Sequence, residues 1–141
     1  MSSFTKLNYK IIFHLMGLLL AVNGCFIFLA AIVSYYYEDG VTSQIFLAGF
    51  VGLLIGGSIM LATKNHKKEI KKREGYIIVA FGWIFMSLVG TLPYIFTGAI
   101  PSFTNAFFET MSGYTTTGAS ILNDIESMPE GILFWRSITH W

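Results

Sequence analysis

Three long runs of apolar residues dominate the first hundred positions of the chain. They cover residues 11–34, Gln44 to Thr63, and Tyr76 to Ile100, and the first run contains His14 and Asn23 as its polar residues. A helix needs about 20 apolar residues to cross the hydrocarbon core of a bilayer, and each run reaches that length. The first run is too long for the apolar part of a signal peptide, so we interpret it as a retained span. The pattern predicts an all-α membrane protein with three transmembrane helices.

The pattern changes after the third run. Residues 101–113, PSFTNAFFETMSG, predict a short helix that begins near Pro101 and Ser102 and stops at Gly113. At 1.5 Å per residue, roughly 11 helical residues give about 16 Å, half of the ~30 Å hydrocarbon core. The polar segment YTTTGAS follows, and then NDIESMPEG, whose carboxylates favour water. The last stretch, ILFWRSITHW, predicts the start of a fourth transmembrane helix.

A helix of this length has two interpretations. It lies on the membrane surface with its polar residues in water, or it enters the membrane as a re-entrant pore helix and the chain returns. The second interpretation requires that the non-helical backbone after it be buried in protein or line a watery cavity. Threonine hydroxyls are weak ligands for a hard cation, and Gly118 permits backbone angles that point successive carbonyls the same way. The residues alone leave both interpretations open.

Composition and charge support a membrane protein and give it a direction. Only 12% of the residues are charged, against about 25% in soluble domains, and the mean hydropathy is +0.62. Six of the nine Lys and Arg residues lie within residues 64–75. Positively charged loops stay in the cytoplasm, so this segment and the N-terminus, with Lys6 and Lys10, are expected there. The acidic segments YYYEDG and 122–130 are then expected outside the cell.

The sequence contains no pattern typical of an enzyme. It shows no nucleophile with a neighbouring base, no phosphate-binding loop and no paired metal ligands, and His14, His66 and His140 are scattered. The net charge of +1 gives no reason to expect a nucleic-acid partner, and we expect no cofactor. Gly52 and Gly56 form a GxxxG pair, which predicts close helix packing within the chain, with homodimerisation as the alternative.

Two charged residues lie near the threonine segment. Glu109, in the short helix, either favours cations by its charge or accepts hydrogen bonds from the backbone of the following loop, and we expect the structural role. Arg136 belongs to the last apolar stretch. An arginine at membrane depth indicates a functional residue by default. Its position is also explained if the side chain pairs with a carboxylate of this loop or extends to the outer membrane surface.

The run FFETMSGYTTTGAS, followed by FWRSITHW, resembles the first pore loop and the next helix of TrkH-type subunits in the Trk/Ktr family of potassium-uptake proteins. The two preceding helices and their basic loop resemble the N-terminal extension of that family. The resemblance implies four repeats of helix, pore loop and helix around one potassium path, each repeat giving one strand of a selectivity filter. The residues that match the first strand, and that would be the only ones here to bind potassium, are Thr115, Thr116, Thr117 and Gly118.

The resemblance also implies an assembly. It implies a homodimer in the plasma or inner membrane of a bacterium or archaeon, surrounded by lipid and coupled to a cytoplasmic nucleotide-binding regulatory subunit of TrkA type. Residues 1–75 would form the two-helix extension with its basic loop, and residues 76–141 the first, incomplete repeat. The chain is then expected to be a truncated N-terminal portion that does not transport alone. The alternative is a non-conducting small membrane protein that binds a partner or anionic lipid through residues 64–75.

Overall fold

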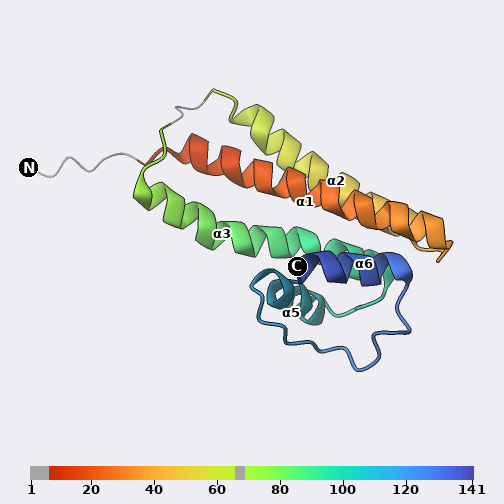
Figure 1. Ribbon diagram of the computed structural model, residues 1–141. Coiled ribbons are helices and arrows are strands. Elements are labelled where there is room, and N and C mark those ends of the chain that lie inside the picture. The colour runs from red at the N-terminus through yellow and green to blue at the C-terminus, as the bar shows by residue number, and fades with distance from the viewer. Residues whose placement is uncertain (1–6, 66–68) are drawn as a thin grey trace, which may run out of the picture.

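Six α-helices form the part of the chain that the computed structural model describes, residues 7–65 and 69–141, and this part contains no β-strand. The helices are α1 (Tyr9–Tyr37), α2 (Thr42–Ala62), α3 (Lys72–Gly90), α4 (Leu92–Thr97), α5 (Phe103–Tyr114) and α6 (Glu130–Thr139). Helix α1, helix α2 and the α3–α4 pair are each long and apolar enough to cross a membrane, so the three predicted spans are confirmed. Figure 1 shows these three stretches side by side, with the short helices α5 and α6 grouped beside them.

Helices α1 and α2 form an antiparallel hairpin (Figure 1). The turn between them begins at Glu38, which has a left-handed φ of 53°, and contains Gly40 at φ 79°. The last residues of α1 are three exposed tyrosines, Tyr35, Tyr36 and Tyr37. Aromatic side chains with a polar tip favour the interface between membrane and water, so this end of α1 suits a position at the membrane surface.

Glycine lets α1 and α2 approach each other backbone to backbone. A methyl group on Gly56 would collide with the amide nitrogen of Ala21 and lie 2.6 Å from the carbonyl oxygen of Gly17. A methyl group on Gly52 would lie between α1 and α3, whereas one on Gly57 would meet no atom within 4 Å. Small residues allow this close packing, so the prediction that the GxxxG pair packs within the chain is confirmed.

The third span is broken near its end. Helix α3 ends at Gly90 and α4 begins at Leu92, with Pro93 in its first turn. Proline has no N–H to donate to the preceding turn, which explains the interruption. At the break the carbonyl oxygen of Gly90 accepts a 3.0 Å hydrogen bond from Trp135 Nε1, so a residue of α6 satisfies a backbone group of α3.

The basic segment predicted as a loop over residues 64–75 is shorter than expected, because α3 begins at Lys72. Within the first turn of α3, Glu74 is buried. Its carboxylate accepts hydrogen bonds from the backbone N–H groups of Lys71 at 3.0 Å and of Asn8 at 2.6 Å. These bonds cap α3 and attach its start to the start of α1. Four basic residues of the segments predicted to lie in the cytoplasm are outside the described residues, namely Lys6, His66, Lys67 and Lys68.

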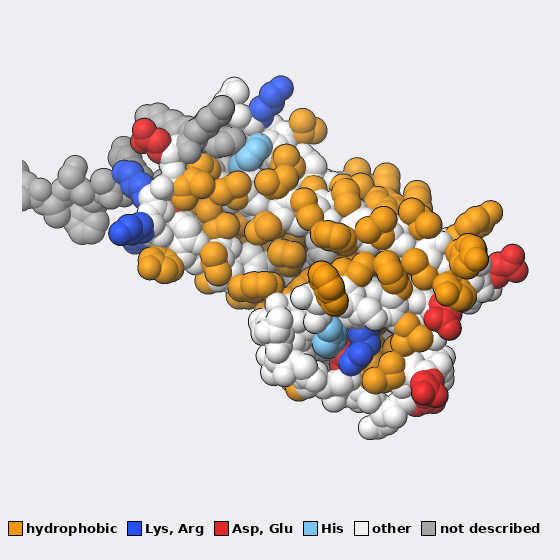
Figure 2. Space-filling view, viewed as in Figure 1, with side chains coloured by type: hydrophobic (Ala, Val, Ile, Leu, Met, Phe, Trp, Pro, Cys, Tyr) orange, Lys and Arg blue, Asp and Glu red, His pale blue; other side chains and the backbone are white. Residues whose placement is uncertain are grey.

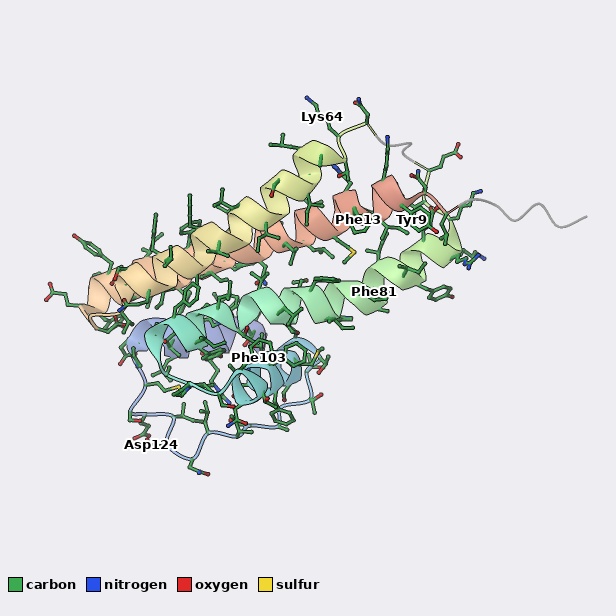
Figure 3. The ribbon with its side chains drawn as sticks, turned by 180° about the vertical axis from the view of Figure 1, so that it is seen from behind. Tyr9, Phe13, Lys64, Phe81, Phe103 and Asp124 are labelled. Carbon is green, nitrogen blue, oxygen red and sulfur yellow. The ribbon has the colours of Figure 1, made fainter. Side chains whose placement is uncertain are left out.

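Most charged side chains gather at two opposite ends of the molecule, and apolar side chains cover the long helices between them (Figure 2). We call the end that holds Tyr9 and Lys64 the proximal end, and the end that holds Asp124 the distal end (Figure 3). Between these ends large apolar side chains are about half exposed, among them Leu29, Phe46 and Phe81. An apolar belt between two charged ends is the pattern of a surface in contact with lipid.

The main core lies where the C-terminal third of the chain packs against the α1–α2 hairpin. Its largest fully buried side chains are Trp135 and Ile132 of α6, Tyr94 of α4, Ile27 of α1 and Ile45 of α2. The short helices are therefore not appended to the three spans. They share one core with them, and this core fixes their position.

Substitution of Gly56 tests the hairpin contact. We expect Gly56→Ala to lower the unfolding temperature of the purified protein in detergent, because overpacking a tight contact costs about 1–3 kcal/mol. Gly57→Ala is the matched control, since its methyl group enters open space and alanine favours a helix more than glycine does. Equal unfolding temperatures for the two variants would contradict this packing.

Candidate functional site: the α5 hairpin and the threonine segment

Helix α5 is the short helix that the sequence predicts, with a corrected end. Its N-cap is Ser102, whose hydroxyl accepts a 3.5 Å hydrogen bond from Asn105 N. The predicted stop at Gly113 is wrong, because the helix continues to Tyr114. Gly113 has a different role. A methyl group there would lie 2.9 Å from Thr139 Oγ1, so glycine is needed for the close approach of α5 and α6.

The end of α5 lies at the level of the middle of the long helices. The hydroxyl of Tyr114 donates a 2.5 Å hydrogen bond to Asn23 Oδ1, and Asn23 lies near the centre of the 29-residue helix α1. Twelve residues give α5 a length of about 18 Å, so it covers only part of the length of its neighbours. The last residue of α5 thus lies at mid-level, far from either end of α1.

The chain then returns to the distal end. Residues 115–129 contain no helix, and they include Asp124, which Figure 3 places at that end. Helix α6 begins beside the end of α1, where Gly131 N donates a 2.9 Å hydrogen bond to Asp39 Oδ2. It finishes against Gly113, back at mid-level. The segment from α5 to the start of α6 is therefore a hairpin that enters and leaves by the distal end.

The threonine segment forms the inner tip of this hairpin. All of residues 115–120 are exposed. Their backbone is attached to the last turn of α5, because Thr116 N donates to Gly113 O at 2.9 Å and Thr117 N donates to Ser112 O at 3.0 Å. These bonds satisfy carbonyls that would otherwise lack partners at the helix end. The segment is thus fixed to α5 by the N–H groups of Thr116 and Thr117, and no hydrogen bond among the described residues ends on a carbonyl of residues 115–118.

The sign of φ alternates along this segment. Thr116 has φ 56° and Gly118 has φ 73°, whereas Thr115 has φ −85° and Thr117 has no positive φ. In an extended strand successive carbonyls point to opposite sides, and alternating the sign of φ turns them toward the same side. The sequence identifies Gly118 as such a position. It gives no signal for Thr116, because a β-branched residue rarely adopts a left-handed conformation.

The threonine and serine hydroxyls beside this backbone are ordered by local bonds. Thr115 Oγ1 donates to Met111 O at 2.7 Å and lies 2.9 Å from Thr117 Oγ1. The hydroxyl of Ser112 donates to Ala119 O at 2.6 Å, which joins the end of α5 to the returning chain. Hydroxyl and carbonyl oxygens thus gather at one tip, and oxygen donors are the ligands that hard cations prefer.

A buried carboxylate holds the two limbs of the hairpin together. Glu109 of α5 is fully buried and forms a 2.8 Å ion pair with Arg136 Nε of α6. It also accepts hydrogen bonds from Ser120 Oγ at 3.0 and 3.1 Å and from Ile121 N at 3.2 Å. The structural interpretation of Glu109 and the pairing of Arg136 with a carboxylate of this loop are both confirmed. Nothing in the sequence identifies Ser120 or Ile121 as partners.

The other candidate residues do not converge on the tip. His14 Nδ1 lies 3.1 Å from Thr63 Oγ1, and His140 Nδ1 lies 2.9 Å from Arg136 O. Among the described residues, no group of three or more histidine, cysteine or acidic side chains is arranged to hold a metal ion. The oxygen atoms at the tip that could bind a cation are uncharged, which suits a cation that is held weakly while it passes through.

Comparison with known proteins agrees with this arrangement. The chain is 36% identical over 136 residues to the Trk system potassium uptake protein TrkH of Salmonella typhimurium. The aligned region covers 96% of this chain and 28% of that protein. The chain is 35% identical, with the same coverage, to TrkH of Escherichia coli strain K12. The crystal structure of the potassium transporter TrkH from Vibrio parahaemolyticus superposes with a TM-score of 0.87 at 33% identity, covering 94% of this chain and 29% of that one.

The chain spans 28% of the length of these curated relatives, so it corresponds to part of such a protein. A model of the TrkH family, described as cation transport proteins, matches residues 41–141. The match includes α5, the threonine segment and α6, and the relatives extend the similarity through α1. With three membrane-length helices, a hairpin beside them and this match, the chain belongs to the TrkH family of cation transport proteins, not to a family of enzymes.

Proposed function

We propose that Thr115, Thr116, Thr117 and Gly118 form one strand of a selectivity filter for potassium, in a Trk-type uptake protein of which this chain is a part. The observation that carries the proposal is the position of an exposed, non-helical segment at the mid-level of three membrane-length helices. Non-helical backbone at that depth is stable only when it is buried in protein or lines a watery cavity. A cation path supplies such a cavity.

The backbone geometry supports the same function. Filters replace the water around an ion with rings of carbonyl oxygens. The alternating φ values at residues 115–118 favour carbonyls that share one side, and the N–H groups of Thr116 and Thr117 are directed to α5. One strand supplies ligands from one side only, so the complete filter needs equivalent strands from further pore loops. We propose that residues 76–141 belong to the first of these repeats and residues 1–75 to an extension before it.

The charged ends support an orientation in the membrane. The exposed cations at the proximal end favour the cytoplasm, and the distal end, which carries acidic residues, then lies outside. We therefore place the N-terminus in the cytoplasm of a bacterial or archaeal cell and the α5 hairpin at the outer face. Ions would then reach the threonine segment from outside. The described cations at the proximal end are Lys10, Lys64, Lys71, Lys72 and Arg73.

The relatives are named as components of the Trk system, which supports an assembly. We propose that the complete protein forms a homodimer and binds a cytoplasmic nucleotide-binding regulatory subunit of TrkA type. The exposed cations of the proximal end also suit contact with anionic lipid headgroups, which attract clustered lysine and arginine. We propose this lipid contact in addition to transport, not as an alternative function.

Replacement of Gly118 tests the filter. In the complete protein we expect Gly118→Ser to weaken the preference for potassium over sodium, because a side chain disfavours the φ of 73°. Growth of an uptake-deficient host on limiting potassium, with and without sodium, measures this preference. Gly98→Ser is the matched control, since Gly98 also has φ 73° and open space but lies outside the hairpin tip. If both variants tolerate sodium as the wild type does, Gly118 is not a filter residue.

Cysteine labelling tests the orientation. In a variant that carries Cys25→Ser to remove the native exposed thiol, single cysteines are placed at Ser43, Asn65 and Ser127. An impermeant thiol reagent added to intact cells should label positions 43 and 127 and leave position 65 unlabelled until the cells are opened. Labelling at position 65 but not at position 43 would reverse the proposed topology.

Neutralising Glu109 tests whether its ion pair with Arg136 holds the two limbs of the hairpin together; we call this ion pair the clamp. Glu109→Gln should destabilise the protein by about 3 kcal/mol, the lower end of the range for breaking a buried ion pair, because Arg136 loses its partner while its side chain is 20% exposed. Combining it with Arg136→Gln should restore part of the loss, since no unpaired charge remains. Glu126→Gln, at an exposed position of the loop, is the control. Thermal unfolding in detergent measures all four proteins, and a Glu109→Gln variant as stable as the control would refute the clamp.

A further inference from the structure

Asn23 is a buried amide in the middle of the apolar helix α1, and the residue is 1% exposed. Both of its polar atoms have partners on other elements. Nδ2 donates a 2.9 Å hydrogen bond to the carbonyl oxygen of Met86 in α3, and Oδ1 accepts the 2.5 Å bond from the hydroxyl of Tyr114 in α5. A buried polar group without such bonds would be costly, so α1, α3 and α5 are connected at this point.

Tyr114 is the last residue of α5 and directly precedes Thr115. Its ring packs against α3, where a methyl group on Gly90 would lie 3.2 Å from Tyr114 Cε2, and its centroid lies 6.4 Å from that of Trp83. These contacts of the ring are apolar. The hydroxyl has one hydrogen bond in the described structure, to Asn23, and this bond ties the end of α5 to the middle of α1.

Asn23 itself is held on a rigid support. A methyl group on its neighbour Gly24 would lie 2.8 Å from Leu53 N and 3.0 Å from Gly49 O, so α1 and α2 are in backbone contact at this level. Because α1 cannot shift without displacing α2, the amide of Asn23 is a fixed reference point. Through the hydrogen bond between Tyr114 and Asn23, the start of the threonine segment is therefore held in place relative to the α1–α2 hairpin.

We propose that Asn23 is a positioning residue for ion selectivity, acting through Tyr114 to hold the first filter strand at its depth. This inference rests on the proposed function of residues 115–118. It assigns the α1–α2 hairpin a part in selectivity, in addition to its place in the membrane. Asn23 contacts no ion. It determines where the carbonyls of the strand lie relative to those of the other strands, because ion coordination is sensitive to the position of each ligand.

Two variants of the complete protein test the proposal. Tyr114→Phe removes one oxygen and retains the ring, and Asn23→Leu removes both hydrogen bonds at similar volume. Tyr114→Phe should reduce the preference for potassium over sodium by roughly three- to tenfold, as expected for loss of one hydrogen bond to a buried group, and Asn23→Leu should reduce it at least as much. The double variant should be no worse than Asn23→Leu, since both changes break the same bond. Tyr76→Phe is the control, because Tyr76 is 77% exposed on α3.

The measurement is the rate of potassium uptake by cells of an uptake-deficient host, at a series of sodium concentrations, with the amount of protein in the membrane determined in parallel. A role in stability alone would lower the maximal rate and the amount of protein while leaving the selectivity ratio unchanged. A selectivity ratio in Tyr114→Phe equal to that of the wild type would overturn the proposal. If Asn23→Leu fails to fold, Tyr114→Phe and its control still decide.

A second measurement separates this inference from the proposed function. A spin label at Thr116 reports the motion of the strand without any transport. We expect it to become more mobile in Tyr114→Phe and to remain unchanged in Tyr76→Phe. If the wild type takes up no potassium, the proposed function fails and the role in selectivity fails with it. If the wild type is selective but neither the ratio nor the label mobility changes in Tyr114→Phe, only the inference about Asn23 fails.

Discussion

The buried carboxylate of Glu109 is the contact on which the arrangement of the C-terminal third depends. It joins three segments, because it pairs with Arg136 of α6, accepts from Ser120 and Ile121 of the returning chain, and belongs to α5 itself. A charge removed from water is stable only with such partners. Each partner in turn limits where the chain after residue 114 can run. The shape of the hairpin tip thus follows from satisfying one carboxylate.

The α1–α2 hairpin is joined to the rest of the chain at three levels. The backbone N–H of Asn8 donates to Glu74 at the proximal end, Asn23 accepts from Tyr114 at mid-level, and Asp39 accepts from Gly131 at the distal end. All three contacts join residues far apart in the sequence, and all three end on the carboxylate or amide of a buried or half-buried residue. Directional polar contacts in an otherwise apolar interface define one register of the helices, whereas apolar contact alone permits several.

The sequence predicts the spans and the short helix correctly, because apolar length and helix start signals are local properties. It predicts Gly113 as a helix stop, whereas the structure uses this glycine for contact with α6, a partner that no local pattern reveals. The left-handed Thr116 contradicts the ordinary preference of a β-branched residue, so the sequence gives no sign of it. Asn23 is visible as a polar residue in an apolar run, but its partners Met86 and Tyr114 are determined by packing.

The depth of the threonine segment, which we place at the level of the middle of α1, can be measured directly. Spin labels at the native Cys25, two residues from Asn23, and at Thr116 and Ser127 in a Cys25→Ser background measure this depth in bilayers whose headgroups carry a gadolinium chelate. We expect weak relaxation of the label by gadolinium at Cys25 and Thr116, and strong relaxation at Ser127. Relaxation at Thr116 as strong as at Ser127 would place α5 on the membrane surface and rule out a hairpin that enters the membrane.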